Sequence, residues 1–192
     1  AMPQFLKDAV IAVEDEKFYE EPGVDWRAIV RAFIANITSG KIIQGASTIS
    51  QQLARNAFLT PERTITRKIR ELILAVQLNR RYSKDEILGL YLNEIPFGPT
   101  FYGIEAGSKG YFGKSAKDLN LAEAALLAAL PQAPSYYSPW GTHQKELIAR
   151  QQFILKKMFA VGKIDQEQLD AALTYALVFQ PLSQGIRAPH FV

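Results

Sequence analysis

The spacing of the apolar residues is the feature that most constrains the fold of this chain. Apolar side chains recur at intervals of three and four almost throughout the sequence, which is the repeat of one face of an α-helix. No segment shows the sustained two-residue alternation of a half-buried strand. With 192 residues, 48% of them hydrophobic, the chain can bury a core of ordinary size. The sequence therefore predicts an all-α protein, built as one domain or as two closely packed lobes.

Caps and breakers divide this pattern into individual helices. We expect helices over residues 5–18, 25–40, 66–81, 142–161 and 165–176, a helix after Ser47 or Thr48, and one after the capping box of Ser83 and Glu86. The helix over 66–81 should bury Ile69, Leu72, Ile73 and Val76. The segment 120–131 is almost entirely Ala and Leu, so its helix should lie at the centre of the core. Residues 95–103 contain two prolines and two glycines and are predicted to form a loop.

Composition excludes several classes of site. The chain has no cysteine, which rules out disulfides, thiolate zinc sites and cysteine nucleophiles. Its two histidines, His143 and His190, are far apart, so neither a histidine metal site nor a Ser-His-Asp triad is expected. No apolar run reaches the roughly 18 residues of a membrane span. The net charge of +3 suits an anionic partner without requiring one.

The stretch GASTISQQLARN, residues 45–56, places uncharged hydrogen-bonding groups at the start of a helix. Ser47 or Thr48 can cap that helix, and Gln51 and Gln52 lie on its first turns. Between residues 54 and 84 follow eight basic residues and only two acidic ones. Guanidinium groups beside hydroxyls and amides can enclose a diphosphate. This predicts a site for an anionic, polyhydroxylated ligand, and the alternative is a solvated helix face.

Two acidic positions stand out. Glu71 follows Arg67 by four residues and Lys68 by three, so the three side chains share one helix face. Glu71 either forms a surface salt bridge with them or is a carboxylate that orients the two cations. Glu14 belongs to the run Glu14, Asp15 and Glu16, of which at most one can point into a given site because neighbouring helical residues diverge by about 100°. Glu14 continues the buried face and is the candidate general base, and the alternative is that the three acids form an exposed helix end.

Five ordered blocks resemble the peptidoglycan glycosyltransferase module of penicillin-binding proteins, glycosyltransferase family 51. They are EDEKFYEEPG, GASTISQQLARN, RKIRELILAVQLN, KDEILGLYLNEIPFGPTFYGIEAGSKGYFGK and LAEAALLAALPQAPSYYSP. The chain departs from the family pattern at three positions. Glu21 stands where histidine is usual, Arg55 replaces a lysine, and Asn79 replaces a glutamate.

The resemblance implies a lysozyme-like larger lobe with a smaller membrane-proximal lobe. It implies that residues 1–192 form a single glycosyltransferase domain, a fragment of a longer membrane-anchored chain at the outer face of the bacterial cytoplasmic membrane. Its substrates would be lipid II and the growing glycan chain, and its leaving group would be undecaprenyl diphosphate. Its inhibitors would be moenomycin-type phosphoglycolipids. Nucleic acid is not an expected partner. Membrane contact would come from the smaller lobe, with residues 31–43 as candidates.

The resemblance also assigns roles to residues. Glu14 would be the general base on the attacking 4-hydroxyl, and Glu71 the second acidic residue, near the donor diphosphate. The substrate-binding residues would be Ser47, Thr48, Gln51, Gln52, Arg55, Asn56, Arg63, Arg67 and Lys68. No cofactor is required, although a divalent cation, Mg or Mn, could accompany the diphosphate.

Two other functions compete with this one. The first is a lysozyme-like hydrolase or lytic transglycosylase, which would need a general acid and no diphosphate pocket. The second is a non-catalytic basic module that binds membrane phospholipid or nucleic acid, whose affinity would fall steeply with salt.

Overall fold

The computed structural model describes residues 2–20, 47–60 and 64–181. Its α-helices are α1 (Gln4–Glu14), α3 (Ile49–Phe58), α4 (Ile65–Arg81), α5 (Lys84–Glu94), α6 (Ile104–Phe112), α7 (Leu121–Ala129), α8 (Gln144–Ala160) and α9 (Gln166–Thr174). Short 3₁₀ turns lie at Ala116–Asp118 and Leu130–Gln132. Within these described ranges there is no β-strand, only an isolated bridge between Pro96 and Tyr102. The prediction of an all-α protein is therefore confirmed for the described part of the chain.

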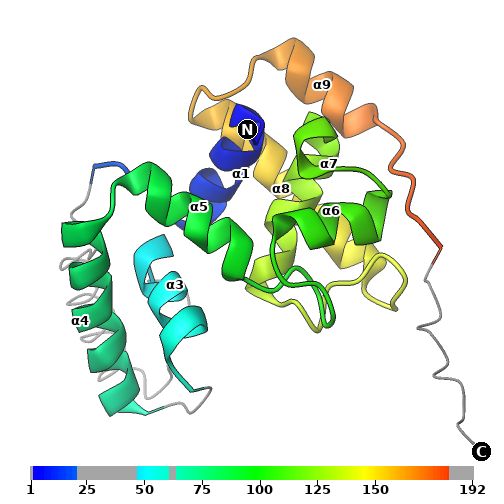
Figure 1. Cartoon of the computed structure of the whole chain (residues 1–192). Coiled ribbons are helices and arrows are strands. Elements are labelled where there is room, and N and C mark those ends of the chain that lie inside the picture. Colours follow the sequence, from blue (N-terminus) through cyan, green and yellow to red (C-terminus); the bar gives the residue numbers. More distant parts are fainter. Residues whose placement is uncertain (1, 21–46, 61–63, 182–192) are drawn as a thin grey trace, which may run out of the picture.

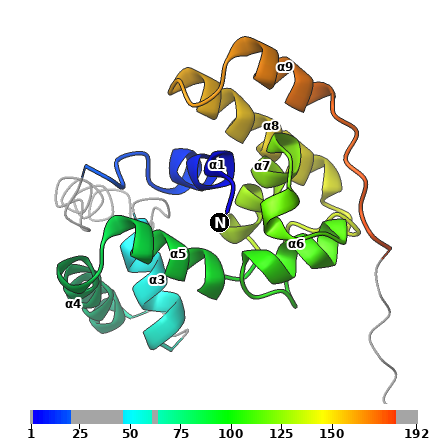
Figure 2. The ribbon, with the colours of Figure 1, turned by 45° about the horizontal axis from the view of Figure 1, so that its top comes forward.

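The helices form two groups (Figures 1 and 2). In the smaller group α3 packs against α4 and α5. In the larger group α1 packs against α7 and α8, and α9 packs against α8. Helix α5 also contacts α6, so it connects the smaller group to the larger one. We call the group of α3 and α4 the smaller lobe. It lies beside the C-terminal end of α1, where Glu14 is located.

Helix α7 occupies the centre of the larger group, as predicted from its composition. Every residue from Ala122 to Ala129 is buried. Its N-terminus carries a capping box, in which the Asn120 side chain accepts from the Glu123 amide and Glu123 accepts in return. The buried residues of α7 are alanine and leucine except for Glu123, which pairs with Lys114 and the Asn120 amide. Helix α7 can therefore be surrounded by α1, α6, α8 and α9 without burying an unpaired Glu123.

Helix α1 is shorter than predicted. We expected it to run to Phe18, but it ends at Glu14, because the Asp15 backbone leaves the helical region and residues 16–20 form turns. The Asp15 carboxylate oxygen Oδ2 instead accepts a hydrogen bond of 3.1 Å from the amide of Ile49, at the start of α3. A negative charge is favourable at a helix N-terminus. The early end of α1 therefore allows Asp15 to join α1 to α3.

The predicted buried face of α4 is wrong. Ile69 and Ile73 are each 53% exposed, and Leu72 and Val76 are only partly buried. The buried residues of α4 are Glu71, Ala75 and Leu78, because α3 and α5 pack on that side of the helix. The buried face of α4 is therefore a different one from the face predicted, and it includes an ion-paired carboxylate, Glu71.

Helix α6 was not expected, since its sequence IEAGSKGYF contains two glycines. The glycines are needed for contact with the preceding loop. A Cβ atom on Gly107 would lie 2.9 Å from Cβ of Phe97, and one on Gly110 would lie 2.3 Å from the ring of Phe101. The loop over 95–103, which was predicted, packs on α6 at these two places.

The predicted helix over 25–40 lies outside the described residues. The candidate membrane segment 31–43 and the substitution at Glu21 fall in the same region. Across the part of the chain that is described, none of the helices combines the length and the apolar character that crossing a bilayer requires.

Candidate active site

The two hydroxyls at the start of α3 have different functions. Thr48 is the N-cap, and its Oγ1 accepts from the amide of Gln51 at 3.3 Å. The Ser47 hydroxyl instead accepts a hydrogen bond of 2.6 Å from Nζ of Lys68. The sequence left open which of the two caps the helix. The structure shows that Thr48 does so, which leaves Ser47 to contact a cation of α4.

The side chains of Gln52 and Glu14 are hydrogen-bonded to each other. Gln52 Nε2 donates to Glu14 Oε2 at 2.8 Å, and its Oε1 accepts from the hydroxyl of Tyr91 at 3.2 Å. Glu14 is largely buried, and its other oxygen, Oε1, lies 4.0 Å from a guanidinium nitrogen of Arg150. A carboxylate held in this way has a fixed orientation, which a general base requires.

The three acids at 14–16 have different neighbours, but α1 ends at Glu14, so helix geometry does not set the directions of the other two. Glu14 meets Gln52 of α3, while Asp15 accepts from the first amide of that helix. Glu16 is exposed and lies 3.5 Å from Nζ of Lys157 on α8. Of this run, Glu14 is therefore the acid that accepts a hydrogen bond from the Gln52 side chain.

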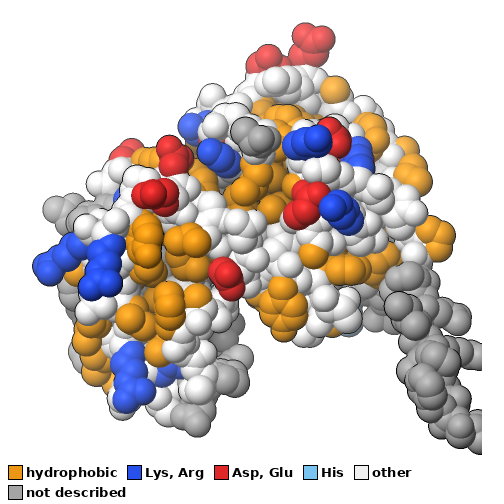
Figure 3. All heavy atoms as spheres, in the orientation of Figure 1, with side chains coloured by type: hydrophobic (Ala, Val, Ile, Leu, Met, Phe, Trp, Pro, Cys, Tyr) orange, Lys and Arg blue, Asp and Glu red, His pale blue; other side chains and the backbone are white. Residues whose placement is uncertain are grey.

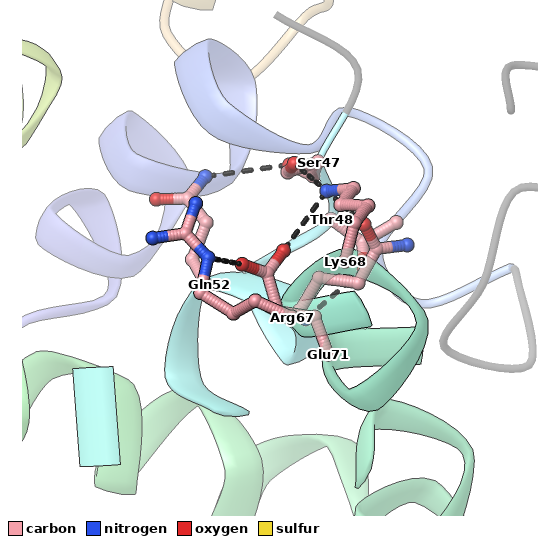
Figure 4. A network of polar contacts seen from close by, with 7 residues as sticks. Ser47, Thr48, Gln52, Arg67, Lys68 and Glu71 are labelled. Atoms are coloured by element: carbon pink, nitrogen blue, oxygen red, sulfur yellow. Dashed lines mark hydrogen bonds and ion pairs between the residues drawn. The ribbon is translucent and has the colours of Figure 1, made fainter. Parts of the chain in front are cut away.

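Glu71 is the centre of a second cluster, shown in Figure 4. Its side chain is only 2% exposed, with Lys68 Nζ 3.0 Å from Oε2 and Arg67 Nε 3.2 Å from Oε1. The Arg67 contact is an ion pair without well-aligned hydrogen-bond geometry. Lys68 also donates to Gln51 Oε1 at 3.2 Å. A buried carboxylate that holds two cations differs from the surface salt bridge that was the alternative interpretation.

The two clusters are continuous. Gln52 Nε2, which donates to Glu14, lies 3.4 Å from the carbonyl oxygen of Ser47. The hydroxyl of the same Ser47 accepts from Lys68, which pairs with Glu71. A fixed carboxylate and a pair of cations therefore lie on either side of residue 47, as Figure 4 shows for the part around Gln52, Ser47 and Lys68.

The other candidates are more dispersed. Arg55 is partly buried on α3 and Asn56 is exposed, and Arg63 lies outside the described residues. Arg70, Arg80 and Arg81 are exposed, and Lys84 sits 4.6 Å from the centroid of the Phe18 ring. Of the described cations between residues 54 and 84, Arg67 and Lys68 are therefore the pair that contacts Glu71. The described cations of this segment therefore do not all gather around Glu71.

Three residues of the site were missed by sequence reasoning. Arg150 approaches Glu14 from α8, and Tyr91 contacts Gln52 from α5. Asn79 donates to Oγ of Ser50 at 2.8 Å and so joins α4 to α3. Arg150 and Tyr91 each occur within an apolar helical pattern with no local sign of function. Asn79 carried a signal, since it stands where the family pattern has a glutamate.

The described residues of the site assemble no cluster of metal ligands. Among the residues that the structure describes, no group of three or more histidine, aspartate or glutamate side chains could hold an ion. Both oxygens of Glu71 already face cations. The site residues therefore do not fit a divalent cation held by the protein itself.

The geometry defines what the site can do. A fixed carboxylate can accept a proton from a hydroxyl group. Cations held a short distance away can stabilise an anion that forms as another bond breaks. Placed together, these groups suit a displacement in which a hydroxyl attacks and a stable anion leaves.

Known proteins resemble this chain over most of its length. Residues 1–159 match the family model described as Transglycosylase. Penicillin-binding protein 1A of Aquifex aeolicus (strain VF5) is 47% identical over 176 residues, which are 92% of this chain and 24% of that protein. The protein of the same name from Neisseria flavescens is 45% identical over 184 residues, 96% of this chain and 23% of that protein.

A solved structure is also similar. The crystal structure of penicillin-binding protein 1A from Haemophilus influenzae matches with a TM-score of 0.48 and 32% sequence identity, over 69% of this chain and 16% of that one. The chain thus spans about a quarter of the length of the two curated relatives named above.

Proposed function

This chain belongs to the transglycosylase family, and we propose that it polymerises lipid II into glycan strands at the extracytoplasmic face of the bacterial cytoplasmic membrane. The growing chain is the donor, and lipid II supplies the attacking 4-hydroxyl. The observation that carries the proposal is the continuous polar network from Glu14 through Gln52 and Ser47 to Lys68. This network supports the proposal because it joins a carboxylate to cations that suit a diphosphate.

In the proposed reaction Glu14 removes the proton of the acceptor 4-hydroxyl. The hydroxyl oxygen forms a bond to the anomeric carbon of the donor, with inversion, as the bond from that carbon to the diphosphate oxygen breaks. Undecaprenyl diphosphate leaves with the bonding electron pair, and Lys68 and Arg67 stabilise its negative charge. Because a diphosphate is a stable anion, the reaction needs cations at the leaving group in place of a strong general acid.

Glu71 supports this step by orienting the cations. Its carboxylate is buried and pairs with Arg67 through one oxygen and with Lys68 through the other. It therefore fixes where the two positive charges lie before the diphosphate binds. Preorganised charge costs no rearrangement during the reaction, which is the main source of electrostatic catalysis. The same cations are the proposed site for moenomycin-type phosphoglycolipids.

A divalent cation at the diphosphate, Mg or Mn, is proposed only as a companion of the substrate. The described side chains offer no ligand cluster, so phosphate oxygens would supply most of the coordination. Titration of turnover with Mg²⁺ in the wild type and in Glu71→Gln tests this. Equal dependence is expected, and a dependence that Glu71→Gln removes would show that Glu71 binds the ion.

Contact with the membrane is proposed for the smaller lobe. Ile65, Ile69 and Ile73 are spaced four residues apart on α4 and are 83%, 53% and 53% exposed. Figure 3 shows hydrophobic side chains interspersed with Lys and Arg on this lobe. A helix with an exposed apolar face and neighbouring cations suits a bilayer surface that carries anionic lipids.

The decisive experiment is incubation of the protein with purified lipid II. We expect glycan chains to grow and undecaprenyl diphosphate to be released. Release of muropeptides from preformed glycan, without chain growth, would instead show the lysozyme-like hydrolase. Salt-sensitive binding to anionic vesicles or nucleic acid with no turnover would show the non-catalytic basic module.

A further inference from the structure

We propose that Tyr91 is a positioning residue for this reaction, because its hydroxyl holds the Gln52 amide in the orientation that donates to Glu14. The proposal rests on the role of Glu14 proposed above. Tyr91 lies on α5 and its side chain is fully buried. Its hydroxyl reaches Gln52 Oε1 at 3.2 Å, and Gln52 Nε2 reaches Glu14 Oε2 at 2.8 Å. Three helices therefore meet at one amide group.

The amide of Gln52 has one orientation that satisfies all its neighbours. Its nitrogen faces two acceptors, the Glu14 carboxylate and the carbonyl oxygen of Ser47. If the amide turned over, its oxygen would face both of these acceptors, and its nitrogen would meet the hydroxyl of Tyr91. The two acceptors set which end of the amide faces Glu14, and donation by Tyr91 to the oxygen at 3.2 Å fixes the amide in that orientation from the other side.

Tyr91 can act as this donor at any pH at which the reaction is measured. Burial, and to a lesser extent the charge of Glu14, raises the pKa of Tyr91 well above its ordinary value. The hydroxyl therefore keeps its proton. Because the ring is enclosed among core residues of α5 and its neighbours, the hydroxyl also has a fixed position.

Tyr91→Phe removes the hydroxyl and keeps the ring. We expect kcat for lipid II polymerisation to fall roughly tenfold, the size expected for the loss of one hydrogen bond that orients a reacting group. KM should change by less than about twofold, because the cations of the donor site remain in place. A rise in KM at unchanged kcat would show that Tyr91 acts on substrate binding, which contradicts the proposal.

Tyr111→Phe is the matched control. Tyr111 is also buried, and its hydroxyl donates to the carbonyl of Phe97 at 2.7 Å, in the loop packed on α6. This variant loses a buried hydrogen bond of the same type away from Glu14. We expect both variants to lower the thermal unfolding midpoint, and only Tyr91→Phe to lower kcat. Equal losses of kcat would assign Tyr91 a merely structural role.

A double-mutant cycle tests the pathway through Gln52. Gln52→Met removes the amide, and we expect it to lower kcat at least as much as Tyr91→Phe does. Adding Tyr91→Phe to Gln52→Met should then cause no further loss. Additive losses, or a Gln52→Met variant of normal kcat, would overturn the proposal. Glu14→Gln is measured in parallel. If this variant retains turnover, the proposed role of Glu14 is wrong, and so is the positioning role of Tyr91. If Glu14→Gln is inactive and Tyr91→Phe is fully active, only the positioning role of Tyr91 is wrong.

Discussion

Glu14 and Glu71 lie at the two ends of one chain of polar contacts. Gln52 donates to Glu14 and lies within 3.4 Å of the Ser47 carbonyl, and the Ser47 hydroxyl accepts from Lys68, which pairs with Glu71. Glu14 has the amide of Gln52 and the guanidinium of Arg150, 4.0 Å away, as neighbours. Glu71 contacts two cations, Arg67 and Lys68. Their surroundings therefore suit the different roles proposed, with proton acceptance at Glu14 and orientation of charge by Glu71.

The cations that contact Glu71 should act on the donor. We expect Arg67→Ala and Lys68→Ala each to lower kcat/KM roughly 100-fold, the loss typical of removing one group that stabilises a developing anion. Steady-state kinetics with lipid II measures the effect. Moenomycin affinity should fall in both variants, because the same cations hold its phosphate group.

Arg81→Ala is the control for these variants, since Arg81 lies on the same helix and is exposed. It should leave kcat/KM within about twofold. If Arg67→Ala and Lys68→Ala behave as Arg81→Ala does, these cations do not contribute to the reaction.

The two hydroxyls at the start of α3 should separate stability from activity. Thr48→Ala removes the N-cap and should lower the free energy of unfolding by about 1 kcal/mol. Ser47→Ala removes the acceptor for Lys68, so it should leave stability nearly unchanged and lower kcat/KM. Urea unfolding and steady-state kinetics on both variants check this, and a loss of stability confined to Ser47→Ala would contradict the assignment.

The exposed isoleucines of α4 should contribute to membrane binding. Ile69→Ser removes apolar surface that is already in water, so the unfolding midpoint should change little. Binding to vesicles that contain anionic lipid should weaken. Ala75→Ser changes a buried position of the same helix. It should lower the unfolding midpoint and leave vesicle binding nearly unchanged. Unchanged vesicle binding by Ile69→Ser would remove this face from the proposed contact.

Glu105 makes stability dependent on pH. Its carboxylate accepts from the amide of Ala116 at 2.9 Å, and this hydrogen bond, with a smaller effect from Lys109, holds the pKa of Glu105 below its usual range. A lowered pKa stabilises the fold above the pKa of the unfolded chain, and this contribution is lost as pH falls through the folded value. Glu105→Gln should therefore unfold at lower urea than the wild type at pH 7. The difference should shrink as the pH is lowered through the acidic range, and a constant difference would contradict this origin.

The sequence predicted the helices well where the local signals were strong. The capping box at Ser83 and the apolar helix after Asn120 were found as expected. The signals failed where distant segments decide the local structure. Asp15 ends α1 because its carboxylate meets the N-terminus of α3, and the glycines of α6 are compatible with a helix because Phe97 and Phe101 pack against them.

The candidate site was predicted in part. Glu14, Gln52, Ser47 and Lys68 come together as the motif order suggested. The buried side of α4 could not be predicted, because a carboxylate that pairs with two cations can be buried where an apolar residue is normally expected. The roles of Tyr91 and Arg150 in the site could not be predicted from the sequence for a related reason. A single polar group in a helical pattern shows its role only when the helices that surround it are placed.

The most direct test of the central claim is the behaviour of Glu14→Gln toward both lipid II and moenomycin. The amide keeps the shape of the side chain but cannot accept the proton, so lipid II polymerisation should be abolished. Moenomycin affinity should stay within about tenfold, or 1.4 kcal/mol, of the wild type, because Arg67 and Lys68 are unchanged. Polymerisation at a wild-type rate by Glu14→Gln would contradict the account, since another group would then have to accept the proton.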